Sequence, residues 1–237
     1  MSDRIVFPGN PWPAGHAVAE VAWLGRLDPA GRLWFDLHLN SAEYYAEDPT
    51  YGDDADDEDD DDSGAWESKI VWGNYHACTL SSTFWGHRGF VAATDERPLA
   101  LDGLAGRAFH VDRDPDRPDA VPPGVAAADI DHEDSAFGIY LLGHDAVGDH
   151  RITFGPRRQP TVFALDWQGR IALRYINRTA PFEYTFHATI DAVALEHIAV
   201  PASMDDGAAD ALLHRVLVDA DLFELAGAGD DRRFVAR

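Results

Sequence analysis

The most regular feature of the chain is a period-two alternation of apolar and polar residues. In the segment 33–40, LWFDLHLN, apolar residues share one face, and the other face carries Trp34, Asp36, His38 and Asn40. This spacing is typical of a half-buried β-strand. The preceding segment, AEVAWLGRLDPAGR, has an apolar run followed by a proline-containing turn that ends at Gly31. Together the two segments predict a β-hairpin.

The same kind of pattern recurs further along the chain. The segment 161–177, TVFALDWQGRIALRYIN, predicts a second hairpin with its turn at Trp167–Gly169. A third hairpin is expected around LLGHDAVGDHRITFG, with its turn within 143–149. Further strands are expected at 70–80, 83–94, 136–143, 150–154 and 184–190.

The C-terminal part of the chain changes to a helical pattern. In PASMDDGAADALLHRVL, Ser203 is the expected helix cap, and two aspartates follow where the helix dipole favours them. The apolar stripe consists of Met204, Ala208, Ala211, Leu212 and Val216. A last short strand is expected at 233–236. The fold class is therefore mainly β, a twisted antiparallel sheet or sandwich with an amphipathic helix near the C-terminus.

Two segments lack any regular pattern. In the segment 48–66, nine of the ten residues from Asp53 to Asp62 are carboxylates, without the alternating ligands and glycine that calcium loops use. We therefore expect a solvated acidic loop there. The segment 112–134 is rich in proline and aspartate, which predicts a second long loop. Since strands of similar pattern flank it, residues 1–237 are expected to form one domain.

Composition narrows the partners and the location. The formal net charge is −23, and the acidic run contributes −9, which leaves −14 elsewhere. Such a field repels nucleic acids and anionic membranes and favours a basic protein partner. The acidity has another reading, because Lys69 is the chain's one lysine and both a GC-rich genome and a salt-adapted proteome produce such compositions. A single cysteine, no signal peptide and no stretch of about 18 apolar residues predict a cytoplasmic protein.

The most unusual stretch by residue type is 72–89, WGNYHACTLSSTFWGHRG. On a strand, His76 and Cys78 would share a face, and such a pair can form an activated thiolate. A buried structural cysteine is the alternative, because the stretch lacks the turn that usually precedes an oxyanion hole. The same stretch also supplies candidate binding residues, which are Trp72, Asn74, His76 and Trp85.

The candidate metal ligands are Asp131 and His132 in DIDHED. No helical zinc motif accompanies them, so a solvated turn is the alternative reading and no cofactor is required. The chain also lacks the glycine-rich phosphate loops and the nucleophile elbow of serine hydrolases.

Three functional hypotheses remain from the sequence. The first is a non-enzymatic binding protein, for instance an immunity-type inhibitor that masks a basic partner. The second is a metal-dependent or His/carboxylate-dependent hydrolase. The third is a small-ligand carrier with a β-lined cavity. An enzyme should show two titratable groups close together in a pocket.

Overall fold

The computed structural model describes residues 3–46, 66–73, 75–84, 86–112, 135–174, 177 and 180–237. The described residues form twelve strands in one sheet, with a single α-helix near the C-terminus, which confirms the expected fold class. The strands are β1 (Arg4–Val6), β2 (His16–Asp28), β3 (Arg32–Ser41), β4 (Thr79–Ser81), β5 (Phe90–Thr94), β6 (Ala108–Val111), β7 (Gly138–Tyr140), β8 (His144–Gln159), β9 (Val162–Ala172), β10 (Tyr184–Ala199), β11 (Phe223–Ala226) and β12 (Arg233–Ala236).

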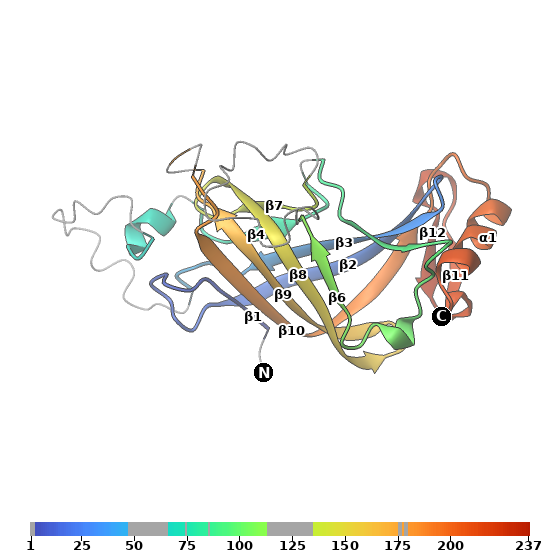
Figure 1. Cartoon of the computed structure of the whole chain (residues 1–237), viewed down its shortest axis with the longest axis horizontal. Coiled ribbons are helices and arrows are strands. Elements are labelled where there is room, and N and C mark those ends of the chain that lie inside the picture. The colour runs from blue at the N-terminus through green and yellow to red at the C-terminus, as the bar shows by residue number, and fades with distance from the viewer. Residues whose placement is uncertain are drawn as a thin grey trace.

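The strand pairings return to their starting point. From β2 the order runs through β3, β4, β7, β8 and β9 to β10, and β10 then pairs with β2. That last pairing is parallel, whereas the other pairings between named strands are antiparallel. Strand β1 lies between the first part of β2 and β10, while β5 pairs with β3 and β6 pairs with β8. The long strands therefore enclose a shared interior (Figure 1).

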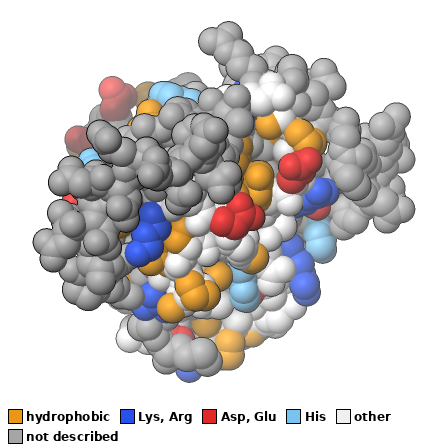
Figure 2. Space-filling view, turned by 90° about the vertical axis from the view of Figure 1, so that its left-hand side faces the viewer, with side chains coloured by type: hydrophobic (Ala, Val, Ile, Leu, Met, Phe, Trp, Pro, Cys, Tyr) orange, Lys and Arg blue, Asp and Glu red, His pale blue; other side chains and the backbone are white. Residues whose placement is uncertain are grey.

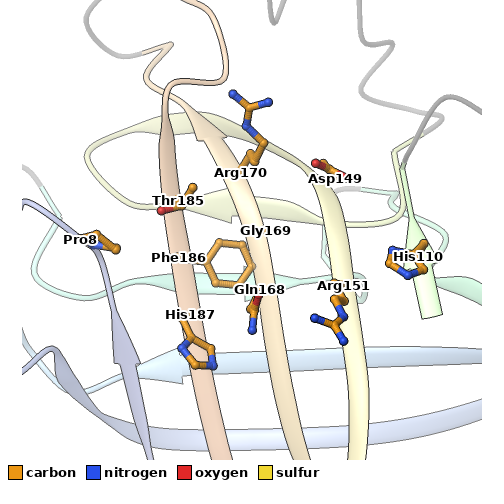
Figure 3. A pocket seen from close by; sticks show the side chains of 10 residues that line it. All are labelled: Pro8, His110, Asp149, Arg151, Gln168, Gly169, Arg170, Thr185, Phe186 and His187. Atoms are coloured by element: carbon orange, nitrogen blue, oxygen red, sulfur yellow. The ribbon is translucent and has the colours of Figure 1, made fainter. Parts of the chain in front are cut away.

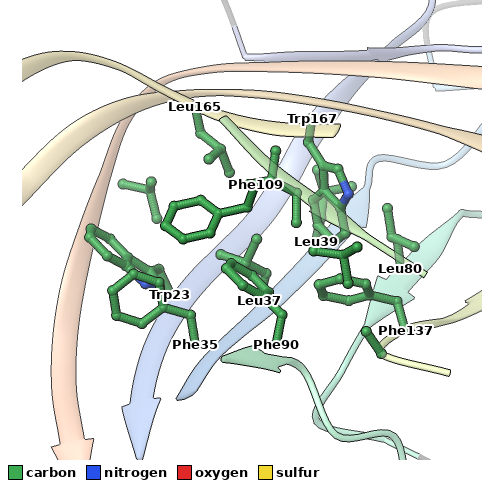
Figure 4. Close-up of a cluster of buried hydrophobic side chains, with 14 of the residues drawn as sticks. Trp23, Phe35, Leu37, Leu39, Leu80, Phe90, Phe109, Phe137, Leu165 and Trp167 are labelled. Atoms are coloured by element: carbon green, nitrogen blue, oxygen red, sulfur yellow. The ribbon is translucent and has the colours of Figure 1, made fainter. Parts of the chain in front are cut away.

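Aromatic side chains fill this interior. Trp23 from β2 packs edge-on against Phe35 from β3, with ring centroids 4.9 Å apart, and it also contacts Phe154 from β8. Deeper along the strands, Phe137 contacts Trp167 at 4.7 Å. Figure 4 shows Trp23, Phe35, Phe137 and Trp167 pointing into this interior from the surrounding chain. Burial of alternate residues is clearest along β9 and accounts for the period-two pattern there, whereas β3 also buries Asp36 and His38 on its other face.

The first predicted hairpin is confirmed. Strands β2 and β3 pair from Val18–Ser41 to Asp28–Arg32, and the turn between them places Gly31 at φ +83°. The side chain of Asp28 accepts hydrogen bonds from the backbone N–H groups of Ala30 and Arg32, which closes the turn.

The second predicted hairpin is wrong, because residues 162–172 form one uninterrupted strand, β9. Gly169 lies inside the strand, where a Cβ atom would approach the Phe186 ring to 2.5 Å and His150 Nδ1 to 2.9 Å. The glycine is therefore required by close packing rather than by a turn. The actual turn between β8 and β9 lies at Pro160 and Thr161.

The third predicted turn is also wrong. Residues 144–149 belong to β8, and the chain reverses earlier, between Tyr140 and His144. Asp149, at φ +49°, instead marks an irregularity within β8. A residue type common in turns here occupies a β-bulge.

Two predicted strands are much shorter than expected. Residues 69–73 form a short 3-10 helix, so the expected strand at 70–80 is reduced to β4. The expected strand at 83–94 is reduced to β5. The Trp72 side chain explains the first difference, because its Nε1–H donates to the Trp66 carbonyl and fixes the helical turn in the core.

The C-terminal helix α1 (Asp206–Val216) is confirmed, but its buried face and its cap differ from those expected. Leu212 and Val216 are buried as predicted, whereas Ala208 and Ala211 are exposed, and the buried face is completed by Ala209 and Leu213. Asp205 is the N-cap, and its side chain accepts a hydrogen bond of 2.7 Å from the backbone N–H of Ala208. The predicted last strand coincides with β12. Together α1, β11 and β12 form the end of the molecule at the right of Figure 1.

Candidate functional site

Of the candidate site residues singled out in the sequence, the structure describes Trp72, His76 and Cys78. Trp72 is fully buried, His76 is exposed on a bend, and Cys78 is fully buried. The expectation that His76 and Cys78 share a strand face is therefore wrong. Asn74 and Trp85 lie outside the described residues, as do Asp131 and His132.

The Cys78 thiol is held in an unreactive environment. Burial raises the pKa of this thiol well above its usual value, with a smaller contribution from nearby Asp145. The backbone of Cys78 is tied to β3, because its N–H donates to Ser41 Oγ and its carbonyl accepts from the Ser41 N–H. These features are those of a structural cysteine.

A polar pocket of about 440 Å³ lies on the outer face of β8, β9 and β10. This volume falls within the range of about 300–1,000 Å³ that is usual for small-molecule sites. Figure 3 shows its lining side chains on the three strands, with Pro8 on one side and His110 of β6 on the other. It is lined by Pro8, His110, Asp149, Arg151, Gln168, Gly169, Arg170, Thr185, Phe186 and His187.

Strand register aligns one wall of the pocket. His110 on β6 pairs with Arg151 on β8, which in turn pairs with Gln168 on β9. Gln168 pairs with His187 on β10. Side chains directly opposite in neighbouring strands have Cβ atoms about 4.5–5.5 Å apart. Four polar side chains thus form a continuous row across four strands (Figure 3).

The opposite wall consists of Asp149, Arg170 and Thr185, and the floor between the two walls is backbone. Arg170 pairs with Thr185 on one side and with Gly148 on the other. Because the pairing of β8 jumps from Gly148 to Arg151, two residues of β8 oppose the single residue Gly169. This bulge lies between the two walls and bends β8. Bulges of this kind are common beside functional sites.

Behind the floor, inward-facing aromatic side chains support the pocket. Phe186 is 1% exposed and packs edge-on against Trp167, with centroids 6.0 Å apart. His150 is fully buried and its Nδ1 accepts a hydrogen bond of 3.2 Å from Trp167 Nε1. The polar outer face therefore rests on a tightly packed layer, which restricts the movement of its strands.

His150 faces a second buried titratable group. Its Nε2 lies 3.8 Å from Asp112 Oδ2, and this carboxylate accepts a hydrogen bond from the backbone N–H of Ala136. Burial lowers the pKa of His150 to about 3 and raises the pKa of Asp112 to about 6. Both shifts have the same cause, since a low-dielectric interior disfavours whichever form is charged.

The two pKa shifts affect stability in opposite directions. The unfolded chain protonates His150 near its ordinary pKa of 6.5 but the folded chain does not, so this group destabilises the fold as pH falls from 6.5 to 3. For Asp112 the folded chain takes up the proton first, near pH 6 rather than 3.8. Its contribution therefore stabilises the fold as pH falls through that window.

A hydrogen-bonded carboxylate and imidazole border the pocket. His187 Nε2 lies 2.6 Å from Asp166 Oδ2, and Gln168 Nε2 donates to the other oxygen of Asp166 at 2.8 Å. The carboxylate orients the imidazole, which leaves Nδ1 as the second polar atom of the ring. Such a pair can accept a proton or a hydrogen bond from a bound molecule.

The two arginines of the pocket differ in their contacts. The guanidinium of Arg170 donates to the Phe182 carbonyl, which ties this side chain to the chain before β10. Arg151 is exposed, and none of the described residues forms a hydrogen bond or an ion pair with its guanidinium. Arg151 thus presents a full positive charge and five N–H donors to the pocket.

Trp66 holds the side of the pocket that Pro8 lines. The Trp66 Nε1–H donates to the Pro8 carbonyl at 3.0 Å, and its ring stacks on Tyr184 at 4.2 Å. Tyr184 directly precedes Thr185 in β10. Trp66 is the last residue of the segment expected to form a solvated acidic loop, but its side chain is only 2% exposed and packs in the core. The remainder of that loop, the acidic run included, lies outside the described residues.

A second pocket, of about 220 Å³, lies beside Trp12, His16 and Tyr44. Its volume is below the usual range for small-molecule sites. Its aromatic residues mainly pack against one another, with Tyr44 1% exposed and Trp12 stacked on it at 6.1 Å. The pocket on β8, β9 and β10 is therefore the stronger candidate.

Within the described ranges, no group of three or more His, Cys, Asp or Glu side chains is placed to hold a metal ion. The helices of the described part of the chain are all too short or too polar to cross a bilayer.

The chain matches no protein-family model, no curated protein sequence and no solved structure.

Proposed function

We propose that this chain is a non-enzymatic binding protein that holds a small polar ligand in the pocket on the outer face of β8, β9 and β10. The observation that carries the proposal is the row of aligned polar side chains on four strands, with the Arg151 guanidinium available for a ligand. The third hypothesis from the sequence, a ligand carrier, is thereby preferred, with the site on the outside of the sheet.

Preorganisation supports this function. The walls are fixed by strand pairing, Asp166 orients His187, and Trp66 fixes the backbone at Pro8. A site on paired strands loses little conformational entropy when a ligand binds. The interior behind it is filled by aromatic side chains, so ligand binding on the outer face leaves the core undisturbed.

A thermal-shift screen with a library of small polar metabolites tests the proposal. A ligand at one hundred times its Kd stabilises a protein by about 2.7 kcal/mol, which raises the Tm of a chain of this size by about 5–10 °C. The variant Thr185→Trp fills the pocket with an indole. Thr189→Trp is the matched control, because Thr189 lies on the same face of the same strand but does not line the pocket.

We expect at least one compound to raise the Tm of the wild type and of T189W but not that of T185W. Contradicting results are a library without any stabilising compound, or stabilisation that T185W retains. Turnover of the bound compound would contradict the non-enzymatic part of the proposal and favour the hydrolase hypothesis, with the Asp166–His187 pair as the proton acceptor.

The formal charge of −23 favours a second candidate, an immunity-type protein that binds a basic partner in the cytoplasm. Exposed carboxylates gather at the α1 end of the molecule, where Asp210 and Asp221 flank His214. The end of the molecule shown in Figure 2 has acidic, basic and hydrophobic side chains interspersed among its described residues. Among the described residues, the α1 end is therefore our candidate surface for a basic partner.

Affinity capture at moderate and high salt, with wild type and the variant D210N/D221N, tests the second candidate. A basic protein that is captured by the wild type, lost at high salt and lost with the variant would support it. An empty capture, or a basic protein that the variant retains, would contradict it.

A further inference from the structure

We infer that the ligand of this pocket carries a carboxylate group, and that Arg151 is its anchor. The inference rests on the proposed function, since it names the chemical class of the ligand for the same site.

The available positive charge is the first argument. Arg151 makes no hydrogen bond or ion pair with the described residues, whereas Arg170 donates to the Phe182 carbonyl. An arginine presents its donors as a planar fork that matches the two oxygens of a carboxylate. A ligand carboxylate at Arg151 can therefore form two parallel, charge-assisted hydrogen bonds.

The neighbours of Arg151 are the second argument. His110 and Gln168 lie directly opposite Arg151 on the strands to either side. His110 is exposed and makes no hydrogen bond with the described residues, and Gln168 has its amide nitrogen on Asp166. The guanidinium thus stands between an imidazole and an amide, and neither group carries a negative charge that would compete with an anion for its donors.

The balance of fixed charge decides which anion fits. The pocket is lined by two arginines and by Asp149, and Asp166 lies next to it behind Gln168 and His187. The formal charges of these two arginines and two aspartates sum to zero, in a protein of net charge −23. Attraction to the arginines and repulsion from the carboxylates both grow with the charge of the ligand, so the pocket has no excess of positive charge that would favour a doubly charged phosphate, and a singly charged carboxylate needs only the fork of Arg151.

NMR titration of the folded protein tests the inference with defined probes. The carboxylates are acetate, succinate and benzoate, their neutral counterparts are acetamide, succinamide and benzamide, and inorganic phosphate is the competing anion. Binding is read from the Nε–H signal of Arg151 and from the backbone amides of Gly169 and Thr185. Hydrogen bonds to charged groups predict a Kd about 10- to 100-fold lower for a carboxylate than for its amide.

Variants of exposed arginines supply the controls. Arg151→Gln should abolish the preference for the carboxylate, and Arg151→Lys should retain only part of it because the planar fork is lost. Arg215→Gln changes the net charge equally, but at an exposed position on α1 that does not line the pocket, and should leave the preference intact.

Several results would overturn the inference. These are equal binding of each carboxylate and its amide, tighter binding of phosphate than of every carboxylate, and a carboxylate preference that survives in R151Q. If one of these results occurs, but a neutral compound from the thermal-shift screen still raises the Tm of the wild type and not that of T185W, the proposed ligand class is wrong and the proposed binding function remains. If T185W also leaves every ligand bound, the proposed function itself is wrong.

Discussion

Replacing Gly169 by alanine perturbs the layer on which the pocket rests. The added Cβ would lie 2.5 Å from Phe186 Cε1 and 2.9 Å from His150 Nδ1. Carbon atoms in contact are normally about 3.5–4.0 Å apart, so the Phe186 ring must move by about 1 Å. Phe186 is 1% exposed and packed against Trp167, which leaves it little space for that movement.

The expected loss of stability follows from two opposing contributions. Overpacking a core position costs about 1–3 kcal/mol, while replacing glycine by alanine within a strand gains about 0.5–1 kcal/mol. For Gly169→Ala we therefore expect a net loss of about 1–2 kcal/mol, or about 2–8 °C in Tm. Gly148→Ala is the matched control on β8, because its Cβ would meet nothing closer than 3.7 Å and should be neutral or stabilising.

Chemical denaturation of the two variants and of the pair G169A/F186L provides the assay. Shortening Phe186 to leucine removes the atoms that clash, so the double variant should recover at least about 1 kcal/mol relative to the sum of the single changes. Additive effects would refute the packing argument. A glycine required for a turn would give that additive result, because the conformation of its backbone does not depend on Phe186.

Three further predictions concern other parts of the molecule. Asp112→Asn removes the carboxyl that stabilises the fold as pH falls. Between pH 7 and pH 4 the free energy of unfolding of the wild type should therefore rise by up to about 3 kcal/mol relative to that of the variant, and parallel curves of unfolding free energy against pH would contradict this. The same variant should expose the acid destabilisation caused by neutral His150. Asp205→Ala should cost about 1 kcal/mol in denaturant unfolding, whereas Ser203→Ala should cost nothing, and equal losses would place the cap elsewhere. The Cys78 thiol should react with a disulfide reagent only after unfolding, and rapid reaction in the native protein would contradict its burial.

The sequence was sufficient for features that depend on local pattern. Alternation at 33–40 and the turn at Gly31 predicted the hairpin of β2 and β3, because each strand buries one face and the turn needs a positive φ. The position of α1 followed from its helical pattern, although the expected cap Ser203 was wrong, because Asp205 caps the helix.

Features that depend on distant contacts could not be predicted in this way. A glycine after Asp-Trp-Gln is equally consistent with a turn and with a crowded strand. The contact with Phe186, which lies 17 residues further along the chain on another strand, decides between the two. The pocket depends on the same kind of information. Reading residues 162–172 as one strand would have placed Asp166, Gln168 and Arg170 on an outer face, but the register that aligns Gln168 with Arg151 and His187 arises from pairing across the sheet.

The most direct test of the ligand site is a crystal structure of the protein soaked with the tightest compound from the screen. The account predicts electron density for the compound between the two walls of the pocket, with its anionic group within hydrogen-bond distance of Arg151. Density in the smaller pocket beside Trp12, or at the α1 end with the pocket on β8, β9 and β10 empty, would contradict it.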